Sequence, residues 1–293
     1  MAGFNVAELP DYVSVNRQEL ISKSLFGFET RKYVNLMAGV KYAEALPVLA
    51  TDPILQDRTC GFDASGNVDF SQRVMEVHPY KVNLELCEED LRKKWMNDQL
   101  VVKAGAETLP FAEKITTNIA ENIASKLETL IWTAKDASNG WDGFLAKFDA
   151  DETVIDASKG ATAYETALNV YKAIPSRILK KAEIFVSEED FRSIVLEITA
   201  KNLYHYNPTV DDAQTIILPG TNTMLHAIPG LNGTGRMVAA DGENLYYGFD
   251  AEDDAETLDL WYSKDAQAFR LAVKFNIGTQ YVFGDEIVVS AAE

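Results

Sequence analysis

The feature that most constrains the fold of this chain is a long amphipathic segment, TLPFAEKITTNIAENIASKLETLIWTA, at residues 108–134. Its large apolar side chains recur at steps of three and four residues, which places them on one face of an α-helix. They are Phe111, Ile115, Ile119, Ile123, Leu127 and Leu130 or Ile131, flanked by the small residues Ala112, Ala120 and Ala124. At 1.5 Å per residue the helix would be about 40 Å long. We therefore predict a spine helix over residues 109–134, with a sheet packed against its apolar face.

The ends of this predicted helix carry residues that favour helix termini. Thr108 is a good N-cap, Pro110 falls in the first turn, and Asn139 and Gly140 follow the C-terminal end. The opposite face of the predicted helix is polar and is covered by Glu113, Lys114, Asn118, Glu121, Asn122, Ser125 and Glu128. Burying each large apolar side chain is worth about 1.5–3 kcal/mol before entropy is subtracted, so the helix needs a covering layer.

The composition excludes several classes of protein. Of 293 residues, 47% are hydrophobic, so the chain can form a substantial core in one or two domains. It holds 27 Lys and Arg against 45 Asp and Glu, a net charge of −18, which argues against binding to free nucleic acid. No apolar run of about 18 residues could span a membrane, and the N-terminus lacks the features of a signal peptide. Cys60 and Cys87 match no metal or disulfide framework and indicate a reducing, intracellular origin.

Residues 1–40 form a leading arm that is too short to be a domain. Asn16 is placed to cap a short helix, RQELISKSLFG, which ends at Gly27, and a second short piece, ETRKYVNLMAGV, follows. The arm has little core of its own, so we expect its apolar side chains to need another surface to cover them.

Residues 41–79 have the least ordinary pattern in the chain. Two stretches, VKYAEALPVLA and FSQRVMEVHPY, have the character of strands, and the segment between them has neither a helical nor a strand period. Loops longer than about 12–15 residues are uncommon inside compact domains, and a lone two-stranded ribbon is marginally stable in water. We therefore predict a long projecting hairpin that becomes ordered on a neighbouring subunit; a disordered loop is the alternative.

The remaining segments predict a mixed α+β fold. Residues 80–86 alternate between apolar and polar side chains, as in a half-buried strand, and a short amphipathic helix, CEEDLRKKWMNDQL, follows. After the spine come a loop, NGWDGFL, and then a helix, a buried strand (AEIFV) and a helix capped by Ser187. Short strands divided by Gly and Pro turns lead to two closing strands, separated by a turn at Gly278.

No constellation of residues predicts catalysis, and we assign no catalytic, cofactor-binding or metal-binding residue. Cys60, His78 and Asp63 could form a nucleophile–base–orienter set, but no fixed spacing or nucleophile motif joins them. An α+β enzyme that uses the region of Cys60 and His78 therefore stays an alternative without a motif behind it.

Three further patterns have ordinary structural explanations. His205 and His226 lack ligand-like neighbours, so zinc is not expected there. Gly233 and Gly235 are not followed by the third glycine of a G-x-G-x-x-G motif, because Val238 stands in its place, and a hairpin turn is the better interpretation. Residues 250–256, DAEDDAE, lack the central Gly and terminal Glu of a calcium loop and are expected to be a solvated acidic loop.

The order of these parts is similar to that of a known family. The motifs are YKVNLELCEEDL leading into the spine, WDGFL after it, then AEIFVSEEDFRSI, HAIPGL, GRMVAADGENLYYGFD and RLAVKFNIGTQYVFGDEIVV. Together, from about Arg17 to Val289, they resemble the major capsid protein of tailed bacteriophages, which has the Hong Kong 97-like fold. The resemblance implies an N-terminal arm (1–40), an extended loop (41–79), a peripheral domain (80–160), an axial domain (161–257) and C-terminal strands that complete the peripheral domain (258–293).

The resemblance also implies a function. The chain would assemble with copies of itself into hexamers and pentamers of an icosahedral shell around double-stranded DNA, without sequence-specific binding. Its other implied partners are a separate scaffolding protein, since only 40 residues precede the extended loop, a portal and decoration proteins. It would be located in the virion after assembly in the host bacterial cytoplasm. The alternative in the same fold is an encapsulin-like compartment. Lys41 lies near the hairpin base, but no partner matches it for the Lys–Asn cross-link of some relatives.

Overall fold

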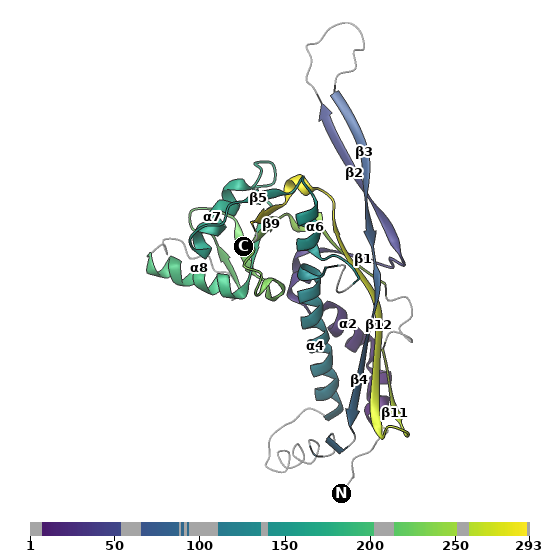
Figure 1. The fold of residues 1–293 in the computed structure, drawn as a ribbon. Coiled ribbons are helices and arrows are strands. Elements are labelled where there is room, and N and C mark those ends of the chain that lie inside the picture. Colours follow the sequence, from purple (N-terminus) through teal and green to yellow (C-terminus); the bar gives the residue numbers. More distant parts are fainter. Residues whose placement is uncertain are drawn as a thin grey trace.

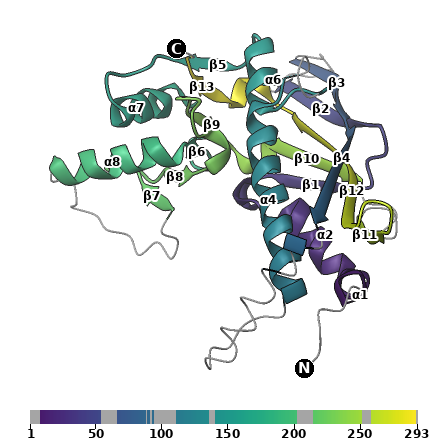
Figure 2. The same ribbon diagram turned by 60° about the horizontal axis from the view of Figure 1, so that its bottom comes forward.

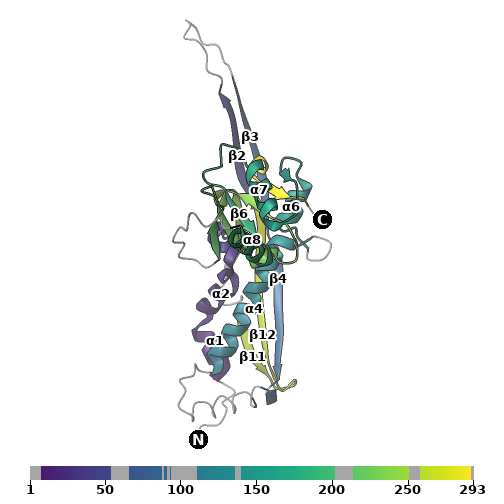
Figure 3. The ribbon, with the colours of Figure 1, turned by 90° about the vertical axis from the view of Figure 1, so that its left-hand side faces the viewer.

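The structure of the chain is a computed structural model, in which residues 8–53, 66–87, 89–90, 93, 111–135, 140–201, 214–250 and 258–291 are described. The molecule is elongated: a body built along one long helix continues into a projecting hairpin, and a second lobe stands beside the body (Figure 1). From the side, the body is thin and the hairpin extends its long axis (Figure 3). Helices and strands both contribute to the body, which confirms the predicted α+β class.

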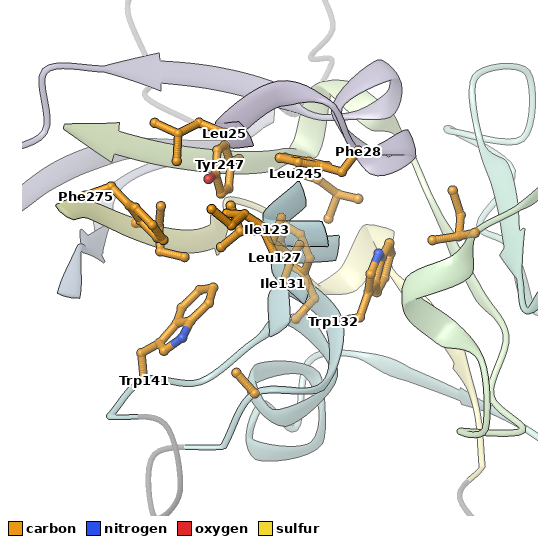
Figure 4. Close-up of a cluster of buried hydrophobic side chains, with 14 of the residues drawn as sticks. Leu25, Phe28, Ile123, Leu127, Ile131, Trp132, Trp141, Leu245, Tyr247 and Phe275 are labelled. Carbon is orange, nitrogen blue, oxygen red and sulfur yellow. The ribbon is translucent and has the colours of Figure 1, made fainter. Parts of the chain in front are cut away.

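The predicted spine helix is present as α4 (Phe111–Thr133), which at 1.5 Å per residue is about 34 Å long. Ile123, Leu127 and Ile131 of its apolar stripe are buried in the main core, where they meet side chains of the sheet (Figure 4). The predicted N-cap, Thr108, lies outside the described residues. The periodicity therefore identified both the helix and the face that it buries.

The leading segment folds onto the body of its own chain. It forms α1 (Glu8–Val15), α2 (Arg17–Phe26), the 3-10 turn η1 (Glu29–Tyr33) and β1 (Asn35–Ala38). α1 contacts β11, and α2 packs along α4, where the small side chains of Ala120 and Ala124 are buried. Val13, Leu20 and Leu25 are buried in the main core. The other surface that these side chains were expected to need is supplied by α4 and the five-stranded sheet of the same chain, and not by a second copy, although Val15 and Leu36 remain exposed.

The cap assignments in this segment were half right. α2 ends at Gly27, as predicted. Asn16 does not cap α2 with its side chain, which instead donates a hydrogen bond back to the Tyr12 carbonyl at 3.0 Å. The short helix α1, absent from the prediction, explains this difference because it places a helix C-terminus where Asn16 can reach it.

A five-stranded sheet covers one side of α4. Its strands are β1, β4 (His78–Cys87), β10 (Leu245–Asp250), β11 (Leu258–Ser263) and β12 (Ala268–Tyr281). β12 pairs antiparallel with β4, β10 and β11, and β1 pairs parallel with β10. Leu245, Tyr247 and Phe275 point from this sheet into the main core (Figure 4). β12 runs without interruption through Gly278, so the turn predicted there is wrong.

A six-stranded sheet forms the second lobe, on the other side of α4 (Figure 2). In spatial order its strands are β5 (Ile155–Ala157), β13 (Val288–Ser290), β9 (Val238–Ala240), β6 (Glu183–Val186), β8 (Met224–Ala227) and β7 (Thr215–Ile217). The helices α7 (Ala163–Ala173) and α8 (Glu188–Ala200) pack with it around a second apolar core. Ser187 caps α8 as predicted, accepting a hydrogen bond from the Asp190 amide at 3.0 Å.

Three strands belong to a different sheet from the one expected. β10 lies within residues 161–257 but pairs with β12 beside the spine. β13 lies within residues 258–293 and β5 within residues 80–160, yet both join the six-stranded sheet. The boundaries at 160 and 257 are therefore wrong for these strands. The physical reason is that an apolar run of three to six residues predicts a strand without predicting its partner.

Short helical pieces join these layers. α6 (Phe144–Ala150) begins where a loop was predicted, with Gly143 before its first turn, and its residues Phe144 and Phe148 are buried in the main core. The single turns η3 (Gly242–Asn244) and η4 (Gly284–Glu286) link a strand of one sheet to a strand of the other, and η2 (Pro229–Leu231) lies between β8 and β9 of the six-stranded sheet and contacts α4.

Candidate assembly surface

The hairpin predicted within residues 41–79 is present, and both of its strands are shifted toward the tip from the strand-like stretches at residues 40–50 and 70–80. β2 (Ala43–Pro53) pairs antiparallel with β3 (Gly66–Glu76) from Ala43 opposite Glu76 to Pro53 opposite Gly66. Beyond its root the ribbon stands clear of the body (Figure 1). A two-stranded ribbon has no second layer of its own, so its faces are covered by another surface or stay exposed.

Alternation of side chains divides this ribbon into two chemically different faces. One face carries no charged residue over most of its length, and we call it the uncharged face: Ala45, Pro47, Leu49, Gly66, Val68, Phe70, Gln72 and Val74. Over the same length the opposite face carries Asp69 and Arg73. Charge is therefore confined to one side of the ribbon.

The root of the hairpin is packed against the outer surface of the five-stranded sheet. A third, small core forms there from Val40, Leu46, Met75, Val77 and Val282. On the sheet, the Gln280 side chain donates a hydrogen bond to the Val74 carbonyl at 2.7 Å. The root is thus held by apolar packing and by a bond to its backbone, while the ribbon beyond it is free.

Two glycines make this packing possible, and we call them the glycine seat. Gly248 of β10 and Gly278 of β12 are register partners, so they share one face of the sheet. A Cβ at Gly248 would lie 2.2 Å from the Met75 sulfur, and a Cβ at Gly278 would lie 2.0 Å from the Glu76 carbonyl oxygen. β3 can therefore cross the sheet only because both positions lack a side chain. This close approach is the physical reason for a glycine at position 278, where the sequence predicted a turn.

A charged cluster fixes the hairpin root to the end of α6. Arg73 forms an ion pair with Asp151 at 2.6 Å and lies over the Tyr281 ring, 4.5 Å from its centroid. The Tyr281 hydroxyl donates to the same carboxylate at 2.7 Å. Burial opposes the charged form of Asp151, but hydrogen bonds from Thr153, Tyr281 and Arg73 outweigh it and hold the pKa of this carboxyl well below its usual range. Asp151 is therefore a charged anchor at neutral pH.

A polar cleft of about 950 Å³ lies beside this anchor. Its walls come from the hairpin root, the loop before α6, α6 itself and the end of β12, and they include both acidic and basic side chains. Lys147 donates a hydrogen bond to the Thr279 carbonyl there. Burial lowers the pKa of Lys147 to about 8, against the opposing influence of Asp142 and Glu76. A fraction of these amines is therefore neutral at physiological pH.

Glu128 is the exception to the polar face predicted for the spine. Its side chain is 2% exposed, and it accepts hydrogen bonds from the Thr30 hydroxyl at 2.6 Å and the Thr30 amide at 3.1 Å. Trp132 donates to the same hydroxyl at 2.7 Å. Burial raises the pKa of Glu128, and the bonds from Thr30 and Gly230 oppose that rise. Glu128 thus ties η1 and η2 to α4 rather than facing solvent.

The residues weighed for nucleophilic catalysis are not brought together by any described contact. Cys60 and Asp63 lie outside the described residues. His78 is the first residue of β4, is half-buried and lines the polar cleft. No interaction of His78 in the described part of the chain indicates a general base.

The other singled-out residues have structural roles or lie outside the described ranges. His226 is buried, with its ring nitrogens 3.3 Å from Glu183 and 3.1 Å from Thr215, and it packs on the Tyr33 ring. His205 and residues 251–256 fall outside the description. Within the described ranges, no group of three His, Cys, Asp or Glu residues is arranged to hold a metal ion.

The hairpin turn predicted at Gly233 and Gly235 is wrong. These residues do form a turn, with φ of +75° and +60°, between β8 and β9. However, β6 lies between these two strands in the sheet, so they are not partners. The prediction assumed that β8 and β9 pair in the sheet because they are adjacent in the sequence.

Comparison with known proteins identifies the fold. No protein-family model and no curated protein matches the chain. A chain of Microbacterium phage Oxtober96 matches with a TM-score of 0.60 at 12% identity, covering 91% of this chain and 91% of its own. A chain of the satellite phage P4 procapsid, in a structure that includes the size determination (Sid) protein, matches with a TM-score of 0.62 at 14% identity, covering 96% and 95%. A virus-like particle from Pyrococcus furiosus matches with a TM-score of 0.55 at 10% identity, covering 96% and 100%.

These matches cover 91–96% of this chain. No described helix combines the length and apolarity needed to cross a membrane. The chain has the α+β, Hong Kong 97-like fold that its sequence motifs resemble.

Proposed function

We propose that this chain is the major capsid protein of a tailed double-stranded DNA bacteriophage, with a structural and not a catalytic role. It assembles into hexamers and pentamers of an icosahedral shell that encloses the genome in the virion. The observation that supports this most is the hairpin: a ribbon that leaves the body with an uncharged, uncovered face, on a chain with the fold of viral shells. An exposed apolar surface promotes aggregation of a monomeric protein, whereas in a shell protein it can form contacts between subunits.

The two lobes suggest a division of labour within that shell. We propose that α4 and the five-stranded sheet form the peripheral domain, and that the six-stranded sheet with α7 and α8 forms the axial domain around the five- and six-fold axes. Rings of five and six need the same lobes at different relative angles, so each lobe stays rigid while the joints between them flex. Weak contacts made with several neighbours at once then sum to a stable shell.

The chain's partners follow from this role. We propose a scaffolding protein, a portal and decoration proteins as partners, with assembly in the host bacterial cytoplasm. The net charge of −18 keeps the inner wall from adhering to packaged DNA. A strongly basic inner surface in an assembled shell would contradict that last point.

Electron microscopy of the purified chain tests the proposal directly. Negative staining at increasing protein concentration is expected to show shells, open sheets or capsomer rings. A chain that sediments as a monomer at high concentration, with its hairpin resistant to protease, would refute the proposal. If the wild-type chain showed an enzymatic turnover that the Cys60→Ala variant lacked, the result would favour an enzyme instead.

An encapsulin-like compartment is the second candidate. The match to the virus-like particle from Pyrococcus furiosus, which covers 100% of that particle's chain, supports this second candidate. Both candidates predict a shell. The neighbouring genes separate them: portal, terminase and protease genes indicate a phage, and a single cargo gene indicates a compartment.

A further inference from the structure

We infer that the uncharged face of the hairpin is the face that seats on a second copy of this chain, and that the charged face is turned away from that copy. This inference rests on the proposed function and adds the side of the ribbon that makes the contact. It concerns the ribbon beyond the root, from Ala45 to Pro53 and from Gly66 to Val74.

The exposure of the side chains marks the face. Phe70 is 81% exposed, and its cross-strand partner Leu49 is 53% exposed. Val68 and Val74 extend the apolar surface on either side of this pair, and both are exposed. Contiguous apolar side chains rimmed by polar ones mark interaction sites, because water is released when they are covered.

The distribution of charge selects a copy of the same chain as the occupant. Two copies that each carry a net charge of −18 repel one another, so a contact between them gains most from a patch without carboxylates. A basic partner would instead be drawn to the opposite face, where the Asp69 carboxylate is exposed and Arg73 is already paired with Asp151. The uncharged face therefore suits a partner as acidic as the chain itself.

The root fixes the direction in which this face points. Met75 is fully buried over the glycine seat, and Arg73 is paired with Asp151. These contacts hold the opposite face against the body at the root, so the uncharged face points outward before any partner arrives. A preorganised surface loses less entropy on binding than a mobile one.

A pair of neighbouring substitutions tests the assignment. Phe70→Asp places a carboxylate on the uncharged face, and Ser71→Asp places the same group one residue away on the opposite face, where side chains are also exposed. The measurement is the protein concentration at which hexamers or shells form, by sedimentation velocity and negative-stain microscopy. We expect Phe70→Asp and Leu49→Asp to raise it roughly 30-fold or more, as for an interface hot spot. Ser71→Asp should change it by less than about threefold.

Folding is monitored in the same samples. Because Phe70 is exposed, its substitution should leave circular dichroism and the urea midpoint of the dissociated chain unchanged, and Phe70→Ala gives a second, uncharged test. Normal assembly of Phe70→Asp, or equal impairment by Ser71→Asp, overturns the assignment of the face while leaving the shell function standing. Failure of the wild-type chain to assemble at all overturns both proposals.

Discussion

The glycine seat predicts a measurable coupling between Gly248 and Met75. An alanine at Gly248 would place its Cβ 2.2 Å from the Met75 sulfur, far inside van der Waals contact. Met75 is fully buried, so it cannot simply swing into solvent, and overpacking of this kind costs about 1–3 kcal/mol. Met75→Ala alone leaves a cavity and costs about 2–5 kcal/mol. In the double variant the new methyl group enters the vacated space, so we expect its cost to fall about 1–3 kcal/mol below the sum.

Urea unfolding of the dissociated chain, followed by tryptophan fluorescence, gives the four free energies of this cycle by linear extrapolation. Gly220→Ala is the matched control. Gly220 has φ of +81° with nothing within 4 Å of an added Cβ, so its substitution costs about 1 kcal/mol of backbone strain only. It should add to Met75→Ala without coupling, because Gly220 lies in the turn between β7 and β8 of the other sheet.

Gly278→Ala provides a contrast within the seat. Its Cβ would lie 2.0 Å from a backbone oxygen of Glu76, which no side-chain truncation can move away. We therefore expect Gly278→Ala to stay destabilising in the Met75→Ala background. If Gly248→Ala and Met75→Ala add within about 0.5 kcal/mol, the seat is not a packing contact and the reasoning is refuted.

Two further predictions concern buried ionisable groups. Because burial lowers the pKa of Lys147 to about 8, the folded chain binds fewer protons than the unfolded chain between about pH 8 and the ordinary lysine value. The difference in unfolding free energy between wild type and Lys147→Met should therefore rise with pH across that window, by at most about 1.4 kcal/mol per pH unit. Urea titrations in which this difference falls with pH would contradict the prediction. Thr30→Val removes the hydroxyl that donates to Glu128, so it should destabilise the chain by about 1.5–3 kcal/mol at neutral pH, and by less at about pH 4, where Glu128 is protonated. Thermal melts at the two pH values check this, and an equal loss at both would contradict it.

The parts of the fold that the sequence predicted well are those whose information is local. The stripe Ile123, Leu127 and Ile131 repeats over several turns, so it specified α4 and its buried face without reference to the rest of the chain. The hairpin was found in the same way, from two strand-like stretches and an aperiodic segment between them. Ser187 and Gly27 marked helix ends because caps act within one turn.

The misreadings at Gly278, at Glu128 and on the hairpin depend on contacts between distant residues, whereas the one at Asn16 depends on the neighbouring helix α1. Gly278 looked like a turn because the strand that crosses above it, β3, lies some 200 residues earlier in the chain. Glu128 has the periodicity of a solvent-facing residue, and only its distant partner Thr30 makes it a buried one. The uncharged face was likewise missed because its definition requires the register of β2 against β3. Within the predicted stretches at residues 40–50 and 70–80, the charges fall equally on both alternations, Lys41 and Glu76 against Glu44 and Arg73, so no local signal marked the face.

Because much of the leading segment is buried within its own chain, the hairpin is the main candidate for contacts between copies. Sequence reasoning left both the arm and the hairpin uncovered, but residues 8–38 are largely satisfied by α4 and the five-stranded sheet. Within the described residues, the ribbon beyond its root is the longest element that the chain leaves uncovered. Its root is ordered by the glycine seat and the Arg73–Asp151 pair during folding, so that ordering is not a cost of association. Each contact between copies can then be weak, which lets misplaced subunits leave, while many such contacts together hold the shell.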